Sequence, residues 1–186
     1  MRTGRICAAV GAAAVMAALM CGCEGGLGGL PLSAGKTPEL DKGWSAQADI
    51  TFGESSAKAD VTRSEQGCWE FAFTEPPELC GVVMTLENGS VSASLGELNV
   101  TAGEGGYTML PLLIADGIDA VSGADKSAMS EKDGVLTIRT EADGSSCTVT
   151  ADSATGGILS FRSPGNKLAA YFSEASPYTE DVGVIE

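Results

Sequence analysis

The 186-residue sequence contains no histidine. Histidine is the usual general base of Ser-His-Asp and Cys-His catalysis and the commonest metal ligand in proteins. Its absence excludes those catalytic triads and removes the simplest metal sites. The serine pairs 55–56 and 145–146 therefore have no histidine to activate them. We expect a protein that is not an enzyme and that uses no metal or cofactor.

Basic residues are also scarce, with 11 Lys and Arg against 25 Asp and Glu. Beyond the N-terminal segment they are scattered singly from Lys36 to Lys167 and form no cluster. Binding to nucleic acid requires clustered cations that displace the counterions of the phosphates. The composition therefore excludes nucleic acid as a partner.

Cysteine motifs are missing too, because no C-x-x-C pair or zinc-type spacing occurs. Beyond residue 23 the chain has an odd number of cysteines, namely Cys68, Cys80 and Cys147. One disulfide plus one thiol fits this count, and so do three thiols. A turn centred on Pro76 would place Cys68 opposite Met84 and Cys80 opposite Ala72. Cys68 and Cys80 would then be poor disulfide partners. The preferred disulfide is then Cys80–Cys147.

The N-terminus has the layout of a secretion signal. Arg2 and Arg5 precede an apolar run over residues 6–20. This run of about 15 residues is shorter than the roughly 20 that cross a hydrocarbon core. Gly22 and Cys23 follow it, and a Gly-rich stretch comes next. The pattern predicts a signal peptide over residues 1–22.

The Gly22–Cys23 pair is similar to the lipobox of bacterial lipoproteins, in which the cysteine is acylated and becomes the new N-terminus. Cys21 fits less well because the bulky Met20 precedes it. An ordinary cleaved signal with an unmodified cysteine is the alternative. The resemblance implies a palmitate-type lipid on Cys23 and a location on the outer face of the bacterial cytoplasmic membrane. Anionic headgroups would repel so acidic a chain, so the lipid would provide the membrane attachment.

Residues 23–43 are rich in Gly, Pro, Ser and Lys without apolar periodicity, which predicts a flexible tether. From residue 44 onward, apolar and polar residues alternate as in half-buried strands. The Asn88-Gly89 pair is a strong hairpin signal. The expected strands cover residues 46–52, 57–62, 69–73, 82–86 and 91–95, the last with an extension through 98–100, and then 135–141, 146–152, 158–162 and 168–173.

One segment has helical periodicity instead. Its apolar positions follow the spacing i, i+3, i+4, i+7, i+8 and i+11 on one face, namely Leu110, Leu113, Ile114, Gly117, Ile118 and Val121. Pro111 suits a first helical turn and Gly123 suits a helix end. The sequence predicts a helix over residues 109–122.

These elements predict a mainly β domain of α+β class over residues 44–173, with an acidic tail over 174–186. Short connections make neighbouring strands antiparallel. About nine twisted strands tend to curl, and the apolar stripe of the helix must cover a surface. We therefore expect a strongly curved antiparallel sheet, or half-open β-barrel, with one amphipathic helix as its lid.

The segments Gly67–Pro76, Leu79–Gly81, Val149–Gly156 and Leu168–Ser173 resemble the lipoprotein-localisation factor (LolA/LolB-like) superfamily, in particular its small lipid-anchored Gram-positive members. The resemblance implies a half-open barrel with a helical lid over an apolar cavity that shields acyl chains. A fatty acid, a phospholipid or the acyl chain of a lipoprotein would be the ligand.

The expected cavity-lining residues come from one aromatic strand face and from the helix, namely Trp69, Phe71, Phe73, Leu110, Leu113, Ile114 and Ile118. The alternative interpretation of these side chains is plain core. Two functions follow from these alternatives. The first is a lipid-anchored protein that binds a hydrophobic ligand, and the second is an interaction module that holds an envelope protein at the membrane surface.

Overall fold

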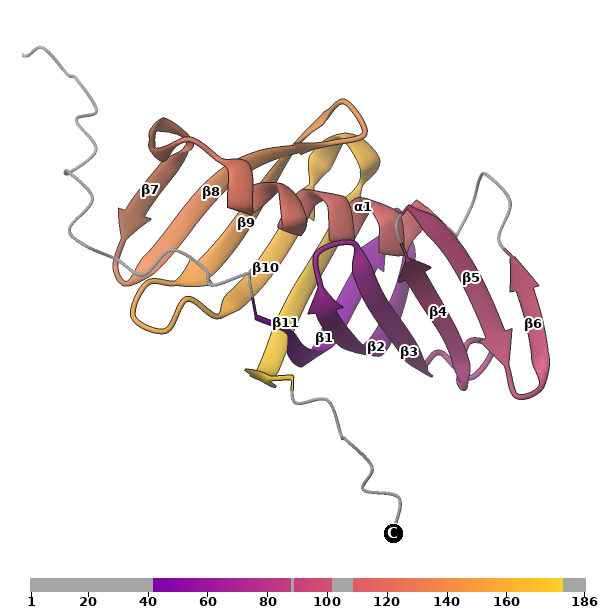
Figure 1. Cartoon of the computed structure of the whole chain (residues 1–186). Helices are drawn as coiled ribbons and strands as arrows, with labels where there is room; N and C mark the ends of the chain where they lie inside the picture. Colours follow the sequence, from indigo (N-terminus) through magenta and orange to yellow (C-terminus); the bar gives the residue numbers. More distant parts are fainter. Residues whose placement is uncertain (1–41, 88, 102–108, 179–186) are drawn as a thin grey trace, which may run out of the picture.

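The computed structural model describes residues 42–87, 89–101 and 109–178 (Figure 1). Before the helix, the strands are β1 (Trp44–Phe52), β2 (Ser55–Glu65), β3 (Cys68–Glu75), β4 (Val82–Glu87), β5 (Ser90–Leu95) and β6 (Leu98–Thr101). The helix α1 (Met109–Asp119) continues into the 3₁₀ turns η2 (Ala120–Gly123) and η3 (Lys126–Ala128). The later elements are β7 (Met129–Lys132), β8 (Val135–Ala142), β9 (Ser145–Asp152), β10 (Ile158–Ser163), η4 (Pro164–Asn166) and β11 (Leu168–Pro177).

All the strands belong to one antiparallel sheet of 11 strands, in the order β6-β5-β4-β3-β2-β1-β11-β10-β9-β8-β7. The first and last strands therefore pair in the middle of the sheet, where Ala48 lies opposite Phe172. Each half of the chain extends outward from this seam as a meander. The seam makes the two halves of the sequence one continuous sheet.

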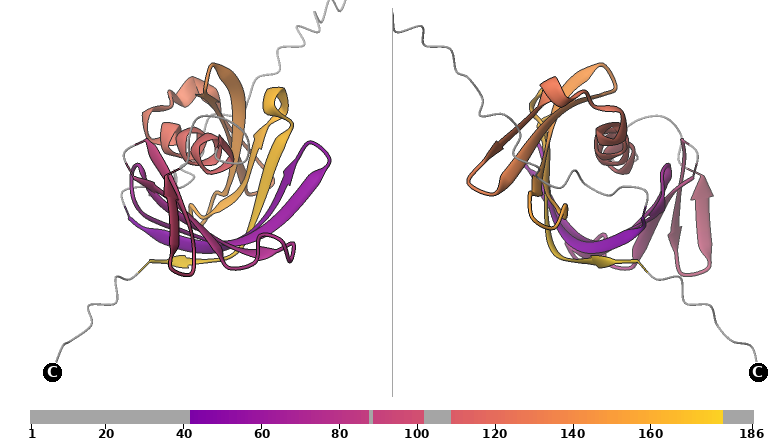
Figure 2. Two further views of the ribbon diagram at one scale, coloured as in Figure 1. Left: turned by 90° about the vertical axis from the view of Figure 1, so that its right-hand side faces the viewer. Right: turned by 60° about the vertical axis from the view of Figure 1, so that its left-hand side comes forward.

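The sheet is strongly curved, and α1 lies across its concave side (Figure 2). Alternation decides which residues face the helix. In β1, Ala46, Ala48 and Ile50 are buried, whereas Gln47 and Asp49 between them are exposed. The buried faces of the strands and of α1 form one apolar core. The predicted fold class, a curved antiparallel sheet with one helix over its concave face, is confirmed.

Several boundaries differ from the expectations. The sheet has 11 strands rather than about nine, because residues 98–101 form a separate β6 and the short β7 precedes β8. The regular α-helix ends at Asp119, and the rest of the predicted helix is 3₁₀. The last strand runs on to Pro177, four residues past its predicted end. The two extra strands are short edge strands, and the other two differences lie at the ends of elements, where periodicity is weakest.

The predicted register between β3 and β4 is wrong by three residues. Cys68 lies opposite Glu87 rather than Met84, and Ala72 lies opposite Val83 rather than Cys80. The cause is the connection over residues 76–81, a hydrogen-bonded turn in which the N–H groups of Leu79 and Cys80 both donate to the Pro76 carbonyl. The prediction assumed a shorter turn centred on Pro76, so it placed the partner of Cys68 too early in β4.

The two free edges of the sheet differ in charge. The edge strand β7 has the sequence Met-Ser-Glu-Lys, whereas β6 has the uncharged sequence Leu-Asn-Val-Thr. Charged residues, lysine above all, discourage the pairing of an edge strand with another chain. The β7 edge has this protection and the β6 edge does not.

Candidate functional site

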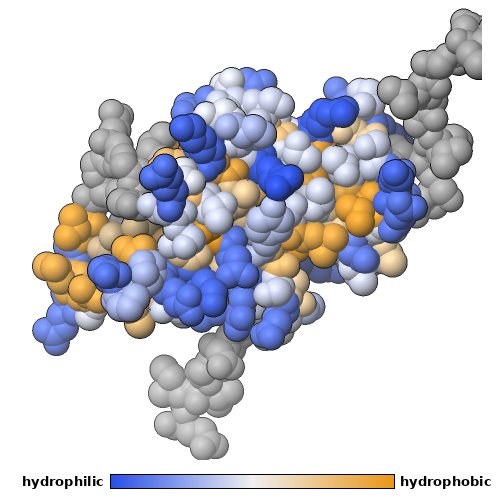
Figure 3. Space-filling view, turned by 180° about the vertical axis from the view of Figure 1, so that it is seen from behind, coloured by the Kyte–Doolittle hydropathy of each residue, from blue (hydrophilic) through white to orange (hydrophobic). Residues whose placement is uncertain are grey.

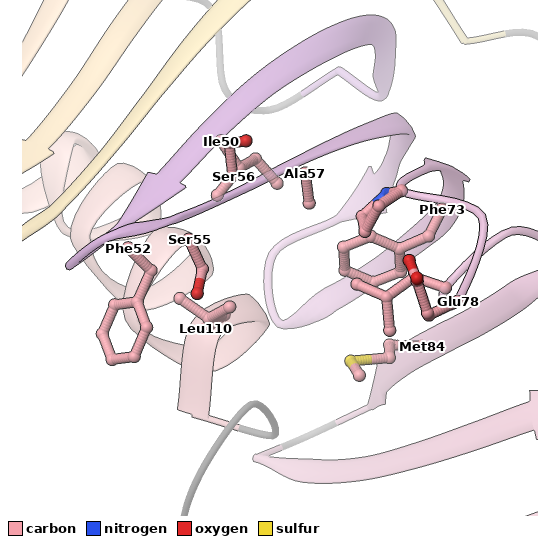
Figure 4. Close-up of a pocket in the computed structure, with 11 residues that line it drawn as sticks. Ile50, Phe52, Ser55, Ser56, Ala57, Phe73, Glu78, Met84 and Leu110 are labelled. Atoms are coloured by element: carbon pink, nitrogen blue, oxygen red, sulfur yellow. The ribbon is translucent and has the colours of Figure 1, made fainter.

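The main candidate site is an apolar pocket between the N-terminal end of α1 and the turns at one end of the sheet (Figure 4). It has a volume of about 340 Å³. The β1–β2 hairpin, the β3–β4 turn, β4 and the first helical turn provide its walls. The lining residues are Ile50, Phe52, Ser55, Ser56, Ala57, Phe73, Pro76, Glu78, Leu79, Met84 and Leu110.

The sequence leaves space at this point for two reasons. First, Ala57 and its neighbours Ser55 and Ser56 are small, so the start of β2 places little side-chain volume in the pocket. Second, Leu110 is the only described residue of α1 that lines the pocket, so the described part of the helix fills little of this end of the sheet. The interior of the domain is close-packed, but these small side chains leave a space between the larger residues Phe52, Phe73 and Met84.

The structure separates the seven residues that we expected to line a cavity into two groups. Phe73 and Leu110 line the pocket. The other five lie outside its lining and are buried in the core between the helix and the sheet, namely Trp69, Phe71, Leu113, Ile114 and Ile118. Two of the seven residues therefore border the pocket, and five lie in the packed core of this structure.

Sequence reasoning missed most of the remaining wall. Met84 was detectable, because it lies on the inward face of a predicted strand. The residues from the β3–β4 turn, such as Pro76, Glu78 and Leu79, had no periodic signal and depended on a register that was wrong. Phe52 sits at the end of β1, where the alternation stops.

At the opposite end of α1, a buried network fixes the helix to the sheet. The Oδ1 atom of Asp119 accepts a hydrogen bond from Nε of Arg63 at 2.8 Å, and this ion pair is almost wholly buried. Its Oδ2 atom accepts from the indole Nε1 of Trp69 at 3.0 Å and from the Gly67 N–H at 2.9 Å. One carboxylate thus connects the last residue of α1 to β2, β3 and the turn between them.

The position of Asp119 makes its partner important. A negative charge at a helix C-terminus opposes the helix dipole, and the last turn of α1 contains no basic residue. The Arg63 guanidinium supplies the missing positive charge from the sheet, and it lies 5.8 Å from the centroid of the Trp69 ring. Asp116, one turn earlier, has its pKa raised by burial and by the neighbouring carboxylates of Asp119 and Asp143.

A second contact holds the same part of the helix close to the other half of the sheet. A Cβ atom at Gly117 would lie 2.2 Å from Cε2 of Phe161, so the ring packs directly on the helix backbone. The Thr140 hydroxyl donates to the Gly117 carbonyl at 2.9 Å. A larger residue at position 117 would require the Phe161 ring or the helix to shift.

The three described cysteines beyond the tether are all free thiols, so the expected Cys80–Cys147 disulfide is absent. Cys80 is exposed in the β3–β4 turn, whereas Cys147 is buried in β9 in the other half of the sheet. Cys68 donates to a Glu65 carboxylate oxygen at 3.6 Å. Burial and this carboxylate raise the pKa of Cys68.

The segment from Asp152 to Gly156 forms a turn between β9 and β10. The Oδ1 atom of Asp152 accepts hydrogen bonds from the N–H groups of Ala154 and Thr155 and from the Thr155 hydroxyl. These donors lower the pKa of Asp152. Within the described ranges, no three His, Cys, Asp or Glu residues are grouped to hold a metal ion.

An exposed apolar strip lies on β5 and β6, next to the pocket. Leu95 pairs with Val82 of β4 and with Leu98 of β6, and Val100 pairs with Ala93. Because paired residues share a face, this strip continues the concave apolar face to the β6 edge. Leu95, Leu98 and Val100 are 52%, 64% and 53% exposed. Apolar residues gather at this end of the molecule in the space-filling view (Figure 3).

In the part of the chain that the structure describes, no helix is long and apolar enough to cross a membrane. The signal peptide, Cys23 and the tether up to residue 41 lie outside the described residues, as do residues 179–186 of the tail. The expectations for them stay predictions.

Comparison with known proteins does not identify a family. No family model and no curated protein matches the sequence. Among solved structures, an uncharacterised conserved protein from Thermus thermophilus aligns over 76% of this chain and 82% of its own length, with a TM-score of 0.46 and 13% identity. A DUF1329 family protein from Desulfovibrio piger aligns over 78% of this chain and 88% of its own length, with a TM-score of 0.40 and 12% identity. A LolA superfamily protein from Nitrosomonas europaea aligns over 77% of this chain and 89% of its own length, with a TM-score of 0.42 and 6% identity. Similarities at these levels leave membership of the lipoprotein-localisation superfamily a prediction.

Proposed function

We propose that this protein binds the alkyl part of a hydrophobic ligand, such as an acyl chain, in the pocket at the N-terminal end of α1. The observation that supports the proposal is a space of about 340 Å³ whose described lining residues are apolar except for Ser55, Ser56 and Glu78. Ligand pockets commonly start at about 300 Å³ and combine apolar walls with a few polar groups at the rim. The composition excludes nucleic acid, and we propose no catalysis.

Burial of hydrocarbon would provide the affinity. Each methylene removed from water contributes about 0.8 kcal/mol, which corresponds to about a fourfold increase in affinity. Affinity should therefore rise with alkyl length and stop rising when the pocket is full. A chain-length series of alkyl alcohols that displaces the uncharged dye Nile red measures both the slope and the limit.

A pair of variants tests the site. Ala57→Phe places a ring in the pocket, because Ala57 points into it from β2 (Figure 4). Ala72→Phe makes the same change on the outer face of β3, since Ala72 alternates with the buried Phe71 and Phe73. We expect Ala57→Phe to weaken Nile red binding at least about tenfold, a loss of about 1.4 kcal/mol, while Ala72→Phe binds normally. Equal binding by both variants would contradict the proposal.

We further propose that the domain is attached through a lipid on Cys23 to the outer face of the bacterial cytoplasmic membrane. The basic start, the short apolar run and the Gly22–Cys23 pair support this. Growth with a labelled fatty acid, followed by membrane fractionation, tests it. Cys23→Ser should lose the label, whereas Cys21→Ser should keep it. Label retained by Cys23→Ser would show that the lipid lies elsewhere.

The second candidate function is an interaction module that holds an envelope protein. The uncharged β6 edge and the exposed side chains of Leu98 and Val100 favour it. A partner that adds a strand there should copurify with the native protein and be lost from Val100→Lys. Leu159→Lys, which changes an exposed residue of β10, is the matched control. Native mass spectrometry distinguishes the two functions, because one predicts a bound lipid and the other a bound protein.

A further inference from the structure

The charges around the pocket restrict the ligand further. Among the described residues that line the pocket, Glu78 is the only charged one, and neither Lys nor Arg is present. Glu78 is exposed on the β3–β4 turn, and it lines the pocket together with Phe73 and Met84 (Figure 4). The polar end of a bound amphiphile would lie at this rim, where water remains available to it.

Neighbouring charges do not reverse the sign of the rim. Glu54 is exposed in the β1–β2 turn, between the lining residues Phe52 and Ser55. The Nζ atom of Lys58 pairs with a carboxylate oxygen of Glu75 at 3.1 Å. Lys58 also alternates with Ala57, so it lies on the outer face of β2.

One described cation lies close to the same turns. Lys167 is exposed in the β10–β11 turn, and its carbonyl accepts a hydrogen bond from the Gly53 N–H at 2.9 Å. It is not part of the pocket lining. Whether the Lys167 charge attracts the headgroup of a bound ligand can therefore be tested separately with a Lys167 variant.

From this arrangement we infer that the ligand of the pocket carries an uncharged or cationic headgroup, and that free carboxylates and other anionic amphiphiles are poor ligands. The inference rests on the proposed alkyl-binding function. An anionic headgroup seated at the rim would face the Glu78 carboxylate and would lose water without gaining a cation from the lining. A cationic headgroup would gain attraction from the same carboxylate, and an uncharged one would be indifferent to it.

Three probes with the same dodecyl chain test the inference, namely dodecanol, dodecyltrimethylammonium and dodecanoate, each used below its aggregation concentration with Nile red displacement as readout. At low ionic strength we expect dodecyltrimethylammonium to bind about tenfold more tightly than dodecanoate, with dodecanol between them. The ratio should shrink as salt is added, because the rim is exposed. Dodecanoate binding as tightly as the cation would overturn the inference, while displacement by dodecanol would still support alkyl binding. Failure of all three probes would overturn both.

Variants then test whether Glu78 causes the preference for the cationic probe over the anionic one. Glu78→Gln should reduce the ratio between the cationic and anionic probes about threefold or more at low salt. Glu97→Gln, an exposed residue in the β5–β6 turn, should leave the ratio unchanged. A ratio that falls equally in both variants would attribute the effect to net charge and overturn the role of the rim. Lys167→Gln should not weaken dodecanoate binding, and a selective loss there would show an anion-binding group that the inference excludes.

Discussion

The two ends of helix α1 meet the sheet in different ways. At its C-terminal end, the Asp119 carboxylate connects the helix to Arg63, Trp69 and Gly67 through buried hydrogen bonds. At its N-terminal end, Leu110 borders an apolar space instead. The same helix is thus held by charge and close packing at one end and faces a cavity at the other.

The difference shows how one element can provide both stability and a binding site. A buried ion pair is strongly directional, and removing one partner is expensive. An apolar contact beside a cavity is not directional and can be replaced by a ligand. We therefore expect substitutions at the C-terminal end to affect the free energy of unfolding and substitutions at the N-terminal end to affect binding as well.

The largest expected effect is that of Asp119→Ala. It removes the carboxylate 2.8 Å from the Arg63 Nε atom and the acceptor of the Trp69 indole. Loss of one partner of a buried pair lowers the free energy of unfolding by about 3–5 kcal/mol. Urea denaturation measures it, and the double variant Arg63→Met/Asp119→Leu should recover part of the loss. A loss below about 1 kcal/mol would show that the network contributes little.

Next in size is the contrast between Leu113→Ala and Leu110→Ala. Both side chains are buried to nearly the same extent, at 4% and 5% exposed. Leu-to-Ala changes cost about 2–5 kcal/mol, and we expect Leu113, inside the packed core, near the upper value and Leu110 near the lower. Leu110→Ala should also change the affinity for Nile red, because it enlarges the pocket. Equal losses of stability with unchanged dye binding would remove the distinction between the two ends.

Gly117→Ala should have a smaller effect. The new methyl group would meet the Phe161 ring, which must move. Overpacking costs about 1–3 kcal/mol, and the higher helix propensity of alanine offsets about 1 kcal/mol of that. The control is Gly123→Ala, where no atom lies within 4 Å of the added Cβ. Thermal unfolding should separate the two variants, and similar melting temperatures would mean that the ring moves freely.

The smallest effect is expected for Asp116→Asn. Burial and the nearby Asp119 and Asp143 raise the pKa of Asp116 in the folded state. Its charged form therefore destabilises the fold above the folded-state pKa, and this penalty disappears as pH falls below the unfolded value. The variant should be more stable by about a few tenths of a kcal/mol near pH 7, because solvent screens this exposed group, and no more stable near pH 3. Urea midpoints at both pH values measure the difference.

The fold followed from the sequence where a residue pattern repeats. Alternation from Ala46 to Ile50 and the Asn88-Gly89 hairpin signal gave strands and pairings that the structure confirms. The stripe through Leu113, Ile114 and Ile118 gave the helix and its buried face. These signals depend on burial of one face, which alternation and helical periodicity report directly.

The site was less predictable because it lies where repeating patterns end. Leu79 belongs to a turn, and Phe52 is the last residue of its strand. The pairing of Arg63 with Asp119 joins residues 56 positions apart and has no local signal. Buried polar pairs of this kind depend on the three-dimensional arrangement of elements, which a single sequence does not specify.

The meeting point of the two ends of the domain has a consequence for how it would sit at a bilayer. The Tyr178 N–H donates to the Gly43 carbonyl at 3.0 Å, so the chain enters and leaves at the same place, beside the start of β1. The pocket lies at the far end of that strand, with Ile50 and Phe52 in its wall. A strand rises about 3.3 Å per residue, so roughly 25 Å separates the attachment point from the pocket. A tether of roughly 20 residues spans up to about 70 Å when extended. With a lipid on Cys23, as we propose, such a tether would be long enough to let the domain turn over and bring its pocket end to the membrane. A tether of a few residues would keep that end facing outward.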